Sequence, residues 1–277
     1  MIYQTGDDDG MKITAVTVCF NAGDKLMDTV KDTLKQDFDD FEILVKDGGS
    51  MDGSVEKLQK YVEETKPAIP VRIVSEKDGG IYDAMNRAVK LAKGEYISFM
   101  NCGDRYADSS VLRKTAKRME ETGNKEIYYG DAYFRTVGNV IHMPKEITPS
   151  VCYRHIPNHQ SCFFKRMLWK DKQLNPKYRI RADYEFFLFW YFEKGVRPVY
   201  LGITVADYEG GGYSESKENR KRDAYEHKVV TEKYMTKEQL AKEKAFRVVT
   251  LQPVRTFIAQ KTPLSKAYDA VKRKIYR

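Results

Sequence analysis

Short apolar segments alternate with amphipathic ones through the first hundred residues, and this alternation limits the possible folds more than any other feature. The apolar segments have the length and β-branched composition of buried strands, and they span 13–18, 41–45, 71–74 and 96–100. Between them apolar residues recur at helical spacing, as in Leu26, Val30 and Leu34. Strands and helices that alternate at this pitch form right-handed βαβ units. We therefore predict an α/β fold with a mostly parallel sheet flanked by helices.

Polar residues follow each predicted strand, at the edge where open parallel sheets bind their ligands. The blocks are FNAG at 20–23, DGGSMDGS at 47–54, EKDGG at 76–80 and NCGD at 101–104. A turn followed by a helix cap accounts for any one block. Several carboxylates at one edge repel each other unless a cation or a hydrogen-bonding ligand offsets their charge. Because GxGxxG and GxxxxGK[ST] motifs are absent from the sequence, dinucleotide and P-loop sites are excluded.

Charge is unevenly distributed along the 277 residues, whose net charge is +8. Residues 1–216 carry 31 basic and 33 acidic side chains, whereas residues 217–277 carry 17 basic and 7 acidic ones. A nearly neutral main domain argues against nucleic acid as a partner. The basic C-terminal segment leaves contact with another anionic surface open.

The four cysteines lack the CxxC spacing of a zinc site and the pattern of a disulfide framework. The first ten residues, MIYQTGDDDG, are polar and acidic, unlike a signal peptide. Uncharged apolar runs in the sequence are all shorter than the roughly 18–20 residues that span a bilayer. We therefore expect a protein of the reducing cytoplasm.

Several stretches together resemble glycosyltransferase family 2, the inverting transferases with a GT-A fold. They are ITAVTVCFNAGDKL, DTLKQDFDDFEILVKDGGSMDGS, SEKDGGIYDAMNRAVKLAKGEYISFMNCGD, HQSCFFKR and RADYEF. They occur in the family's order, and the third is similar to bacterial enzymes that build polysaccharides and lipid-linked glycans. The resemblance implies a GT-A catalytic domain over 12–216, with a nucleotide-binding part at 12–104 and an acceptor part at 105–216. Residues 1–11 are then a disordered or leader segment, and 217–277 are a helical basic extension.

The resemblance also implies which residues bind the nucleotide sugar. Phe20 matches a contact to the base, and Asp47 matches the aspartate that accepts a hydrogen bond from a uracil imide. Asp78 and the glycines after it match a segment that lines the pocket. The full implied set is Phe20, Asn21, Asp47, Gly48, Asp78, Gly80, Asn86 and Asn101.

The block at 101–104 occupies the position of the family's DxD motif, which holds a divalent cation on the donor diphosphate. Here Asn101 and Gly103 replace the usual aspartates, and only Asp104 remains. Mn²⁺ or Mg²⁺ needs few protein oxygens when phosphates and water supply the others. We expect metal binding through Asp104, weakened by the missing carboxylates.

In the family a carboxylate at the start of a helix is the general base, and the resemblance assigns this role to Asp183. An apolar helical run, 186–192, follows it. Inverting transfer needs such a base, because the acceptor hydroxyl loses its proton as it attacks. The alternative is that Asp183 only caps the helix and that Glu185, or no residue, acts as the base.

The resemblance places His159 and Gln160 beside the donor sugar and the acceptor. His159 could equally be a structural, hydrogen-bonded histidine. A zinc site that pairs it with His155 is disfavoured, because Pro157 between them opposes a helix. The glycine-rich segment 210–214 is either a loop that closes over substrate or a surface linker.

Apolar residues near the C-terminus fall on one helical stripe, and basic residues flank it. The stripe consists of Leu264, Tyr268, Val271 and Ile275. Such a helix, within 250–277, is typical of peripheral contact with an anionic membrane at its cytoplasmic face. Packing on the protein or on a second subunit is the alternative.

Together these features predict an inverting glycosyltransferase of cell-surface polysaccharide synthesis, which moves a hexosyl or N-acetylhexosaminyl group. The donor is a nucleotide sugar, UDP-linked by resemblance, and the acceptor is a glycan or a polyprenyl-diphosphate-linked glycan. A nucleotidyltransferase is a rival, but it needs a glycine-rich basic loop that 20–23 does not supply. A degenerate, non-catalytic scaffold of a polysaccharide assembly complex is the other rival, and Asn101 and Gly103 motivate it.

Overall fold

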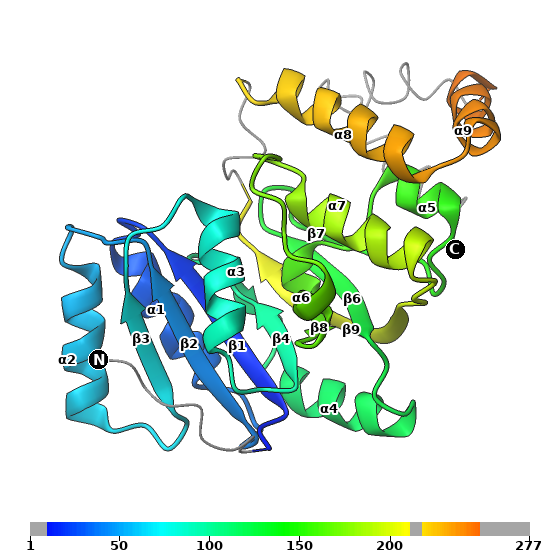
Figure 1. Ribbon diagram of the computed structural model, residues 1–277. Coiled ribbons are helices and arrows are strands. Elements are labelled where there is room, and N and C mark those ends of the chain that lie inside the picture. The colour runs from blue at the N-terminus through cyan, green and yellow to red at the C-terminus, as the bar shows by residue number, and fades with distance from the viewer. Residues whose placement is uncertain (1–9, 211–217, 250–277) are drawn as a thin grey trace.

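A computed structural model describes residues 10–210 and 218–249, which form an α/β molecule around one sheet (Figure 1). In the described residues the strand order is β3-β2-β1-β4-β8-β6-β9-β5, with β7 paired to β6. The elements in chain order are β1 (Ile13–Cys19), α1 (Asp24–Thr33), β2 (Phe41–Asp47), α2 (Ser54–Thr65), β3 (Val71–Ser75), α3 (Ile81–Leu91), β4 (Tyr96–Phe99), β5 (Arg105–Tyr106), α4 (Val111–Glu121), β6 (Ile127–Phe134), β7 (Asn139–Ile141), α5 (Pro149–Arg154), η1 (His159–Ser161), β8 (Cys162–Lys165), α6 (Leu168–Asp171), α7 (Ala182–Leu188), η2 (Phe189–Glu193), β9 (Val199–Tyr208), α8 (Arg220–Tyr234) and α9 (Lys237–Val249).

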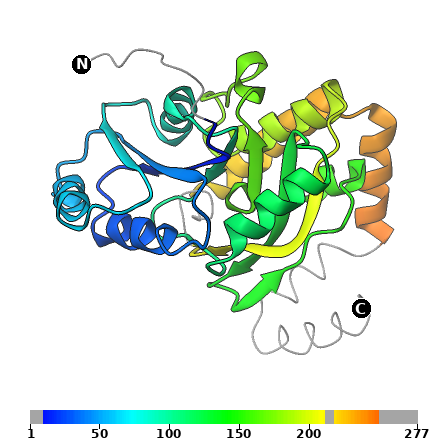
Figure 2. The same cartoon turned by 90° about the horizontal axis from the view of Figure 1, so that it is seen from below.

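The strands and helices predicted for the first hundred residues are confirmed. β1 pairs in parallel with β2 and β4, and β2 pairs in parallel with β3. Helix α3 covers one face of these strands, and α1 and α2 cover the other (Figure 2). Every residue of β1 and β2 is buried, which explains why both strands read as apolar runs without strict alternation.

Beyond β4 the sheet is mixed. β8 is antiparallel to both β4 and β6, whereas β9 is parallel to β6 and antiparallel to β5. The mostly parallel arrangement expected from the first hundred residues therefore holds from β3 to β4 only. β6 and β7 form a further antiparallel pair, because the short connection between them returns the chain directly.

The C-terminal helices pack on the body of the molecule. α8 lies against α7 and α9 lies against α5 (Figure 1). Val230 and Tyr234 of α8 belong to the same buried cluster as Tyr184 and Leu188 of α7. α8 therefore shares the core of the molecule.

Several sequence predictions lie outside the described residues. They concern the segment before residue 10, most of the glycine-rich segment at 210–214, and the stripe within 250–277. Among the described helices, none is both long and apolar enough to span a membrane.

Candidate functional site

A cavity of about 510 Å³ lies at the carboxyl ends of the parallel strands. Its lining includes several of the residues predicted to bind the nucleotide sugar: Phe20, Gly48, Asp78, Gly80 and Asn101. Phe20 follows β1 and is 64% exposed, an unusual position for a large aromatic side chain. A phenyl ring at the rim of a cavity suits stacking on a planar ligand.

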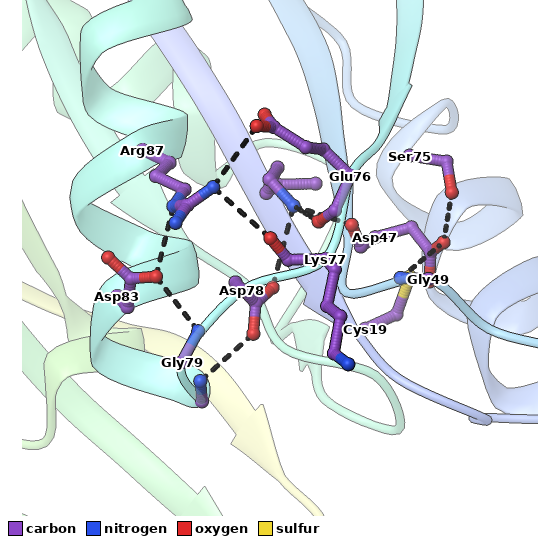
Figure 3. Close-up of polar contacts among 12 residues, drawn as sticks. Cys19, Asp47, Gly49, Ser75, Glu76, Lys77, Asp78, Gly79, Asp83 and Arg87 are labelled. Carbon is purple, nitrogen blue, oxygen red and sulfur yellow. Dashed lines mark hydrogen bonds and ion pairs between the residues drawn. The ribbon is translucent and has the colours of Figure 1, made fainter.

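Asp47 lies beneath this cavity, at the end of β2, and is fully buried. Its carboxylate accepts hydrogen bonds from the Ser75 hydroxyl and from the Gly49 N–H at 3.0 Å (Figure 3). It also accepts hydrogen bonds from the N–H and the hydroxyl of Ser50. Burial tends to raise the pKa of Asp47, but these hydrogen bonds outweigh it and lower the pKa. Asp47 therefore stabilises the loop after β2. It is absent from the residues that line the cavity.

Lys46 is a fully buried lysine that the sequence analysis did not select. Its ammonium group donates to the carbonyl oxygens of Asp47 and Glu76 and lies 3.4 Å from Asp78 Oδ2. Asp78 also accepts a hydrogen bond from the Gly80 N–H, which fixes the carboxylate at the cavity wall. The signal in the sequence was a lysine inside an apolar strand, directly before Asp47.

The two predicted asparagines at 21 and 86 have other partners. Asn21 bonds the loop after β2, through Ser50 Oγ at 2.7 Å and the Met51 N–H at 2.9 Å. Asn86 is a buried residue of α3, and its amide bonds the Leu174 backbone and the Trp169 indole. Neither asparagine lines the cavity, so the structure places both as supports for the surrounding loops.

A second cavity, of about 580 Å³, contains His159, Gln160 and Asp183 in its wall. His159 Nδ1 lies 2.9 Å from Asp183 Oδ2, and His159 Nε2 lies 3.1 Å from the Asn101 amide nitrogen. Because the amide donates to Nε2, a neutral His159 carries its proton on Nδ1 and donates it to Asp183. Asn101 lines the first cavity. The chain Asn101–His159–Asp183 therefore connects the two cavities.

Asp183 is the second residue of α7, and Arg181 occupies the N-cap position. Its Oδ1 accepts the Tyr184 N–H at 2.8 Å, and its Oδ2 faces His159. Burial tends to raise the pKa of Asp183, but the hydrogen bond from His159 opposes it, and the pKa of Asp183 is lowered. An ionised carboxylate in a cavity wall can accept a proton.

Glu185, the alternative base, is fully buried and lines neither cavity. Its Oε1 accepts hydrogen bonds from Lys172 at 2.9 Å, from Lys233 at 2.7 Å and from the Tyr234 hydroxyl. These contacts tie α8 to α7. They leave Asp183 as the better placed of the two carboxylates.

Asp104, the remaining carboxylate of the DxD position, is buried beside the first turn of η1. Its Oδ1 accepts the Glu209 N–H at 2.9 Å, and its Oδ2 accepts the Gln160 amide at 2.8 Å. Burial raises the pKa of Asp104. Nearby, Asn101 Oδ1 and Gln160 Oε1 are buried without a hydrogen-bond partner among residues 10–210 and 218–249.

These groups fit a divalent cation that takes most of its ligands from substrate. A cation favours the ionised form of a buried carboxylate, and it can use amide oxygens that otherwise lack a partner. Within residues 10–210 and 218–249, no cluster of three or more His, Cys, Asp or Glu could hold a metal by itself. A metal here therefore depends on Asp104 together with phosphate and water oxygens.

Known proteins resemble this chain in sequence and in fold. The family model "Glycosyl transferase family 2" matches residues 14–196. A PGL/p-HBAD biosynthesis glycosyltransferase of Mycobacterium bovis is 29% identical over 186 residues, which cover 66% of this chain and 71% of that protein. A cholesterol galactosyltransferase of Borreliella burgdorferi is 29% identical over 122 residues, 44% of this chain and 33% of that protein.

Solved structures show the same fold. S. aureus TarS 1–349 in complex with UDP-GlcNAc matches with a TM-score of 0.64 at 18% identity, over 84% of this chain and 69% of that one. The match to the longer TarS structure covers only 39% of that chain. The mannosyltransferase PcManGT of Pyrobaculum calidifontis, in complex with GDP-Man and Mn²⁺, matches with a TM-score of 0.67 at 15% identity. The match covers 98% of this chain and 89% of that one. The fold is therefore that of GT-A glycosyltransferases.

Proposed function

The chain belongs to glycosyl transferase family 2, and we propose that it moves a sugar from a UDP-sugar to a glycan or lipid-linked glycan, with inversion. The observation that carries the proposal is the hydrogen-bonded chain Asn101–His159–Asp183, which joins the cavity beside Phe20 to the cavity that contains Asp183. One cavity then holds the nucleotide sugar and the other the acceptor. The UDP-GlcNAc complex of TarS supports UDP as the first nucleotide to test.

In the proposed reaction the acceptor hydroxyl oxygen forms a bond to the anomeric carbon. The bond from that carbon to the diphosphate oxygen breaks on the opposite side, and its electron pair leaves with the nucleoside diphosphate. The hydroxyl proton passes to the Asp183 carboxylate, which His159 holds in place at 2.9 Å. A single displacement of this kind inverts the configuration at the anomeric carbon.

On the donor side, Phe20 stacks on the base, and Asp78 and Gly80 border the pocket. Asp104 would hold Mn²⁺ or Mg²⁺, with the unpartnered oxygens of Asn101 and Gln160 close to the same turn. When bound, the cation would supply positive charge against the leaving diphosphate. The Mn²⁺ complex of PcManGT supports a metal of this class.

The variant Asp183→Asn tests the base. We expect nucleotide release to fall by on the order of 10² to 10⁴, the usual contribution of a general base, with nucleotide affinity unchanged. Asp171→Asn is the control, because Asp171 is an exposed carboxylate on α6 that lines neither cavity. Near-normal turnover by Asp183→Asn would remove Asp183 from the role.

The donor is identified by nucleotide release from UDP-GlcNAc, UDP-glucose, UDP-galactose and GDP-mannose, with an acceptor extract from bacterial envelope glycans. Each reaction is run with Mn²⁺, with Mg²⁺ and with EDTA. Full activity in EDTA would exclude the metal at Asp104. No release from any donor would favour the non-catalytic scaffold.

A further inference from the structure

The segment directly before Asp183 is held by a glutamate from a distant helix. Glu226 of α8 accepts hydrogen bonds from three consecutive backbone N–H groups, those of Arg179 at 3.0 Å, Ile180 at 2.9 Å and Arg181 at 3.0 Å. The Arg222 guanidinium lies 3.3 Å from the same carboxylate. Glu226 is only 3% exposed. A carboxylate buried to this degree needs such donors, because an unpaired buried charge is strongly destabilising.

A second contact holds the same segment from the opposite side. The Tyr82 hydroxyl of α3, in the nucleotide-binding half, donates to the carbonyl oxygen of Ile180. Tyr82 also lies 3.4 Å from Asp183 Oδ1. Arg181 adds an ion pair with Asp223 of α8, at 2.7 Å. The backbone before Asp183 is therefore fixed between α3 and α8.

Helix α7 has no local device that could do this. Arg181, at its N-cap position, makes no side-chain capping hydrogen bond, and Asp183 is the second residue of the helix. The position of Asp183 against His159 then depends on the backbone of 179–181. Misplacement of a reacting group by about 1 Å can cost on the order of 100-fold in rate.

We infer that Glu226 is a positioning residue for sugar transfer, which sets the geometry of Asp183 through the backbone at 179–181. The inference rests on the proposed role of Asp183 as the base. It makes α8 part of the catalytic machinery although α8 lies outside the matched family segment, 14–196. Glu226 itself lines neither cavity, so it acts on turnover and not on nucleotide binding.

The test uses Glu226→Gln in the full chain, with nucleotide release from the donor that is active among UDP-GlcNAc, UDP-glucose, UDP-galactose and GDP-mannose. In the wild type, three N–H groups share the two carboxylate oxygens of Glu226. Glutamine has only one oxygen that can accept their hydrogen bonds. We expect kcat to fall about 10- to 100-fold, with the donor KM and the Kd for UDP unchanged. A purely structural role would lower the melting temperature and leave kcat per folded molecule unchanged, and that result would overturn the inference.

A pH profile gives a second readout. The groups that face Asp183 are His159 from η1, Tyr82 from α3, Cys162 from β8 and Arg181. Among them, His159 lowers the pKa of Asp183 most, so a displaced Asp183 loses that effect. The acid limb of kcat then moves to higher pH in Glu226→Gln. An acid limb identical to that of the wild type would also contradict the inference.

Glu243→Gln is the matched control. Glu243 is likewise a buried glutamate of the C-terminal helices, but it lies 3.4 Å from Arg154 of α5 and not at the 179–181 backbone. We expect this variant to lose stability and to keep the wild-type kcat and pH profile. A matching loss of kcat in Glu243→Gln would show that any loosening of these helices suffices, and would overturn the specific role of Glu226.

Tyr82→Phe keeps the inference testable if Glu226→Gln does not fold. It removes the hydroxyl that donates to Ile180 and lies 3.4 Å from Asp183 Oδ1, and we expect the same pattern: lower kcat, unchanged UDP affinity and a shifted acid limb. Unchanged kcat in Tyr82→Phe would count against positioning through this segment. If Asp183→Asn retains transfer, the base assignment fails; if only the Glu226 and Tyr82 variants retain it, the base stands and the positioning role fails.

Discussion

His159 has one ring nitrogen at the donor cavity and the other at the proposed base, Asp183. This arrangement leads to a prediction about the pH dependence of activity. In His159→Ala, Asp183 loses the hydrogen bond that opposes the effect of burial on its pKa. The pKa of Asp183 therefore rises, and activity is lost at higher pH as the solution is acidified. The acid limb of kcat moves upward, and a pH–rate profile measures it.

The control for this prediction is His159→Asn, whose amide can still donate a hydrogen bond from near the Nδ1 position. We expect its acid limb to lie closer to that of the wild type. If the profile of His159→Ala keeps the wild-type acid limb, the hydrogen bond does not set the pKa of Asp183.

Phe20 is the residue for which exposure itself suggests a ligand. Stacking between an aromatic side chain and a base contributes about 1–3 kcal/mol in nucleic-acid binding proteins, so Phe20→Ala should weaken UDP binding about 5- to 150-fold. Its melting temperature should stay the same, because the ring is 64% exposed. Calorimetric titration with UDP measures the effect.

Met51→Ala is the control for Phe20→Ala. Met51 is 90% exposed on the neighbouring loop and does not line the cavity. Equal UDP affinity of the two variants would place the base elsewhere.

At the scale of elements, Lys46 links β2 to the segment after β3. Lys46→Met leaves two carbonyl oxygens and the Asp78 carboxylate without their buried donor. Removal of one partner of a buried ion pair typically costs about 3–5 kcal/mol. We expect a loss of stability of this order, measured by urea unfolding, together with weaker UDP binding as Asp78 is released.

Lys57→Met is the matched control, because Lys57 and Asp24, which form an ion pair at 3.3 Å, are both exposed to solvent. Such a pair contributes about 0–1 kcal/mol. A Lys46→Met protein as stable as Lys57→Met would show that the buried ammonium is dispensable.

A strand or helix could be predicted from the sequence where its own residues show apolar periodicity. Strands β1 to β4 and the helices between them follow from local apolar periodicity, and the polar blocks after them indicate the edge that binds ligands. The partners of individual side chains could not be predicted, because they come from distant parts of the chain. Glu226 meets Ile180 across 46 residues, and Asn86 meets Leu174 across 88. A carboxylate in a charged, amphipathic stretch has the same local pattern whether it is solvated or buried against a loop.

At the scale of the whole molecule, the basic C-terminal segment bears on where the enzyme meets its acceptor. Residues 250–277 carry seven basic side chains and one acidic one. Each basic residue near an anionic leaflet contributes about 1 kcal/mol, and the interaction is screened by salt. We therefore predict that the full chain floats with vesicles rich in phosphatidylglycerol at low salt, and less so at high salt.

A truncated control chain has to end after α9. Glu226 of α8 and Glu243 of α9 both contact the rest of the molecule. A truncation before residue 249 would therefore disturb the 179–181 segment as well as any membrane contact. A chain that ends at residue 249 keeps both helices and removes only the basic segment. It should release UDP from its donor at the rate of the full chain, and it should stay at the bottom of the flotation gradient. If both chains float equally, the membrane contact lies elsewhere; if neither floats, the segment packs on protein instead.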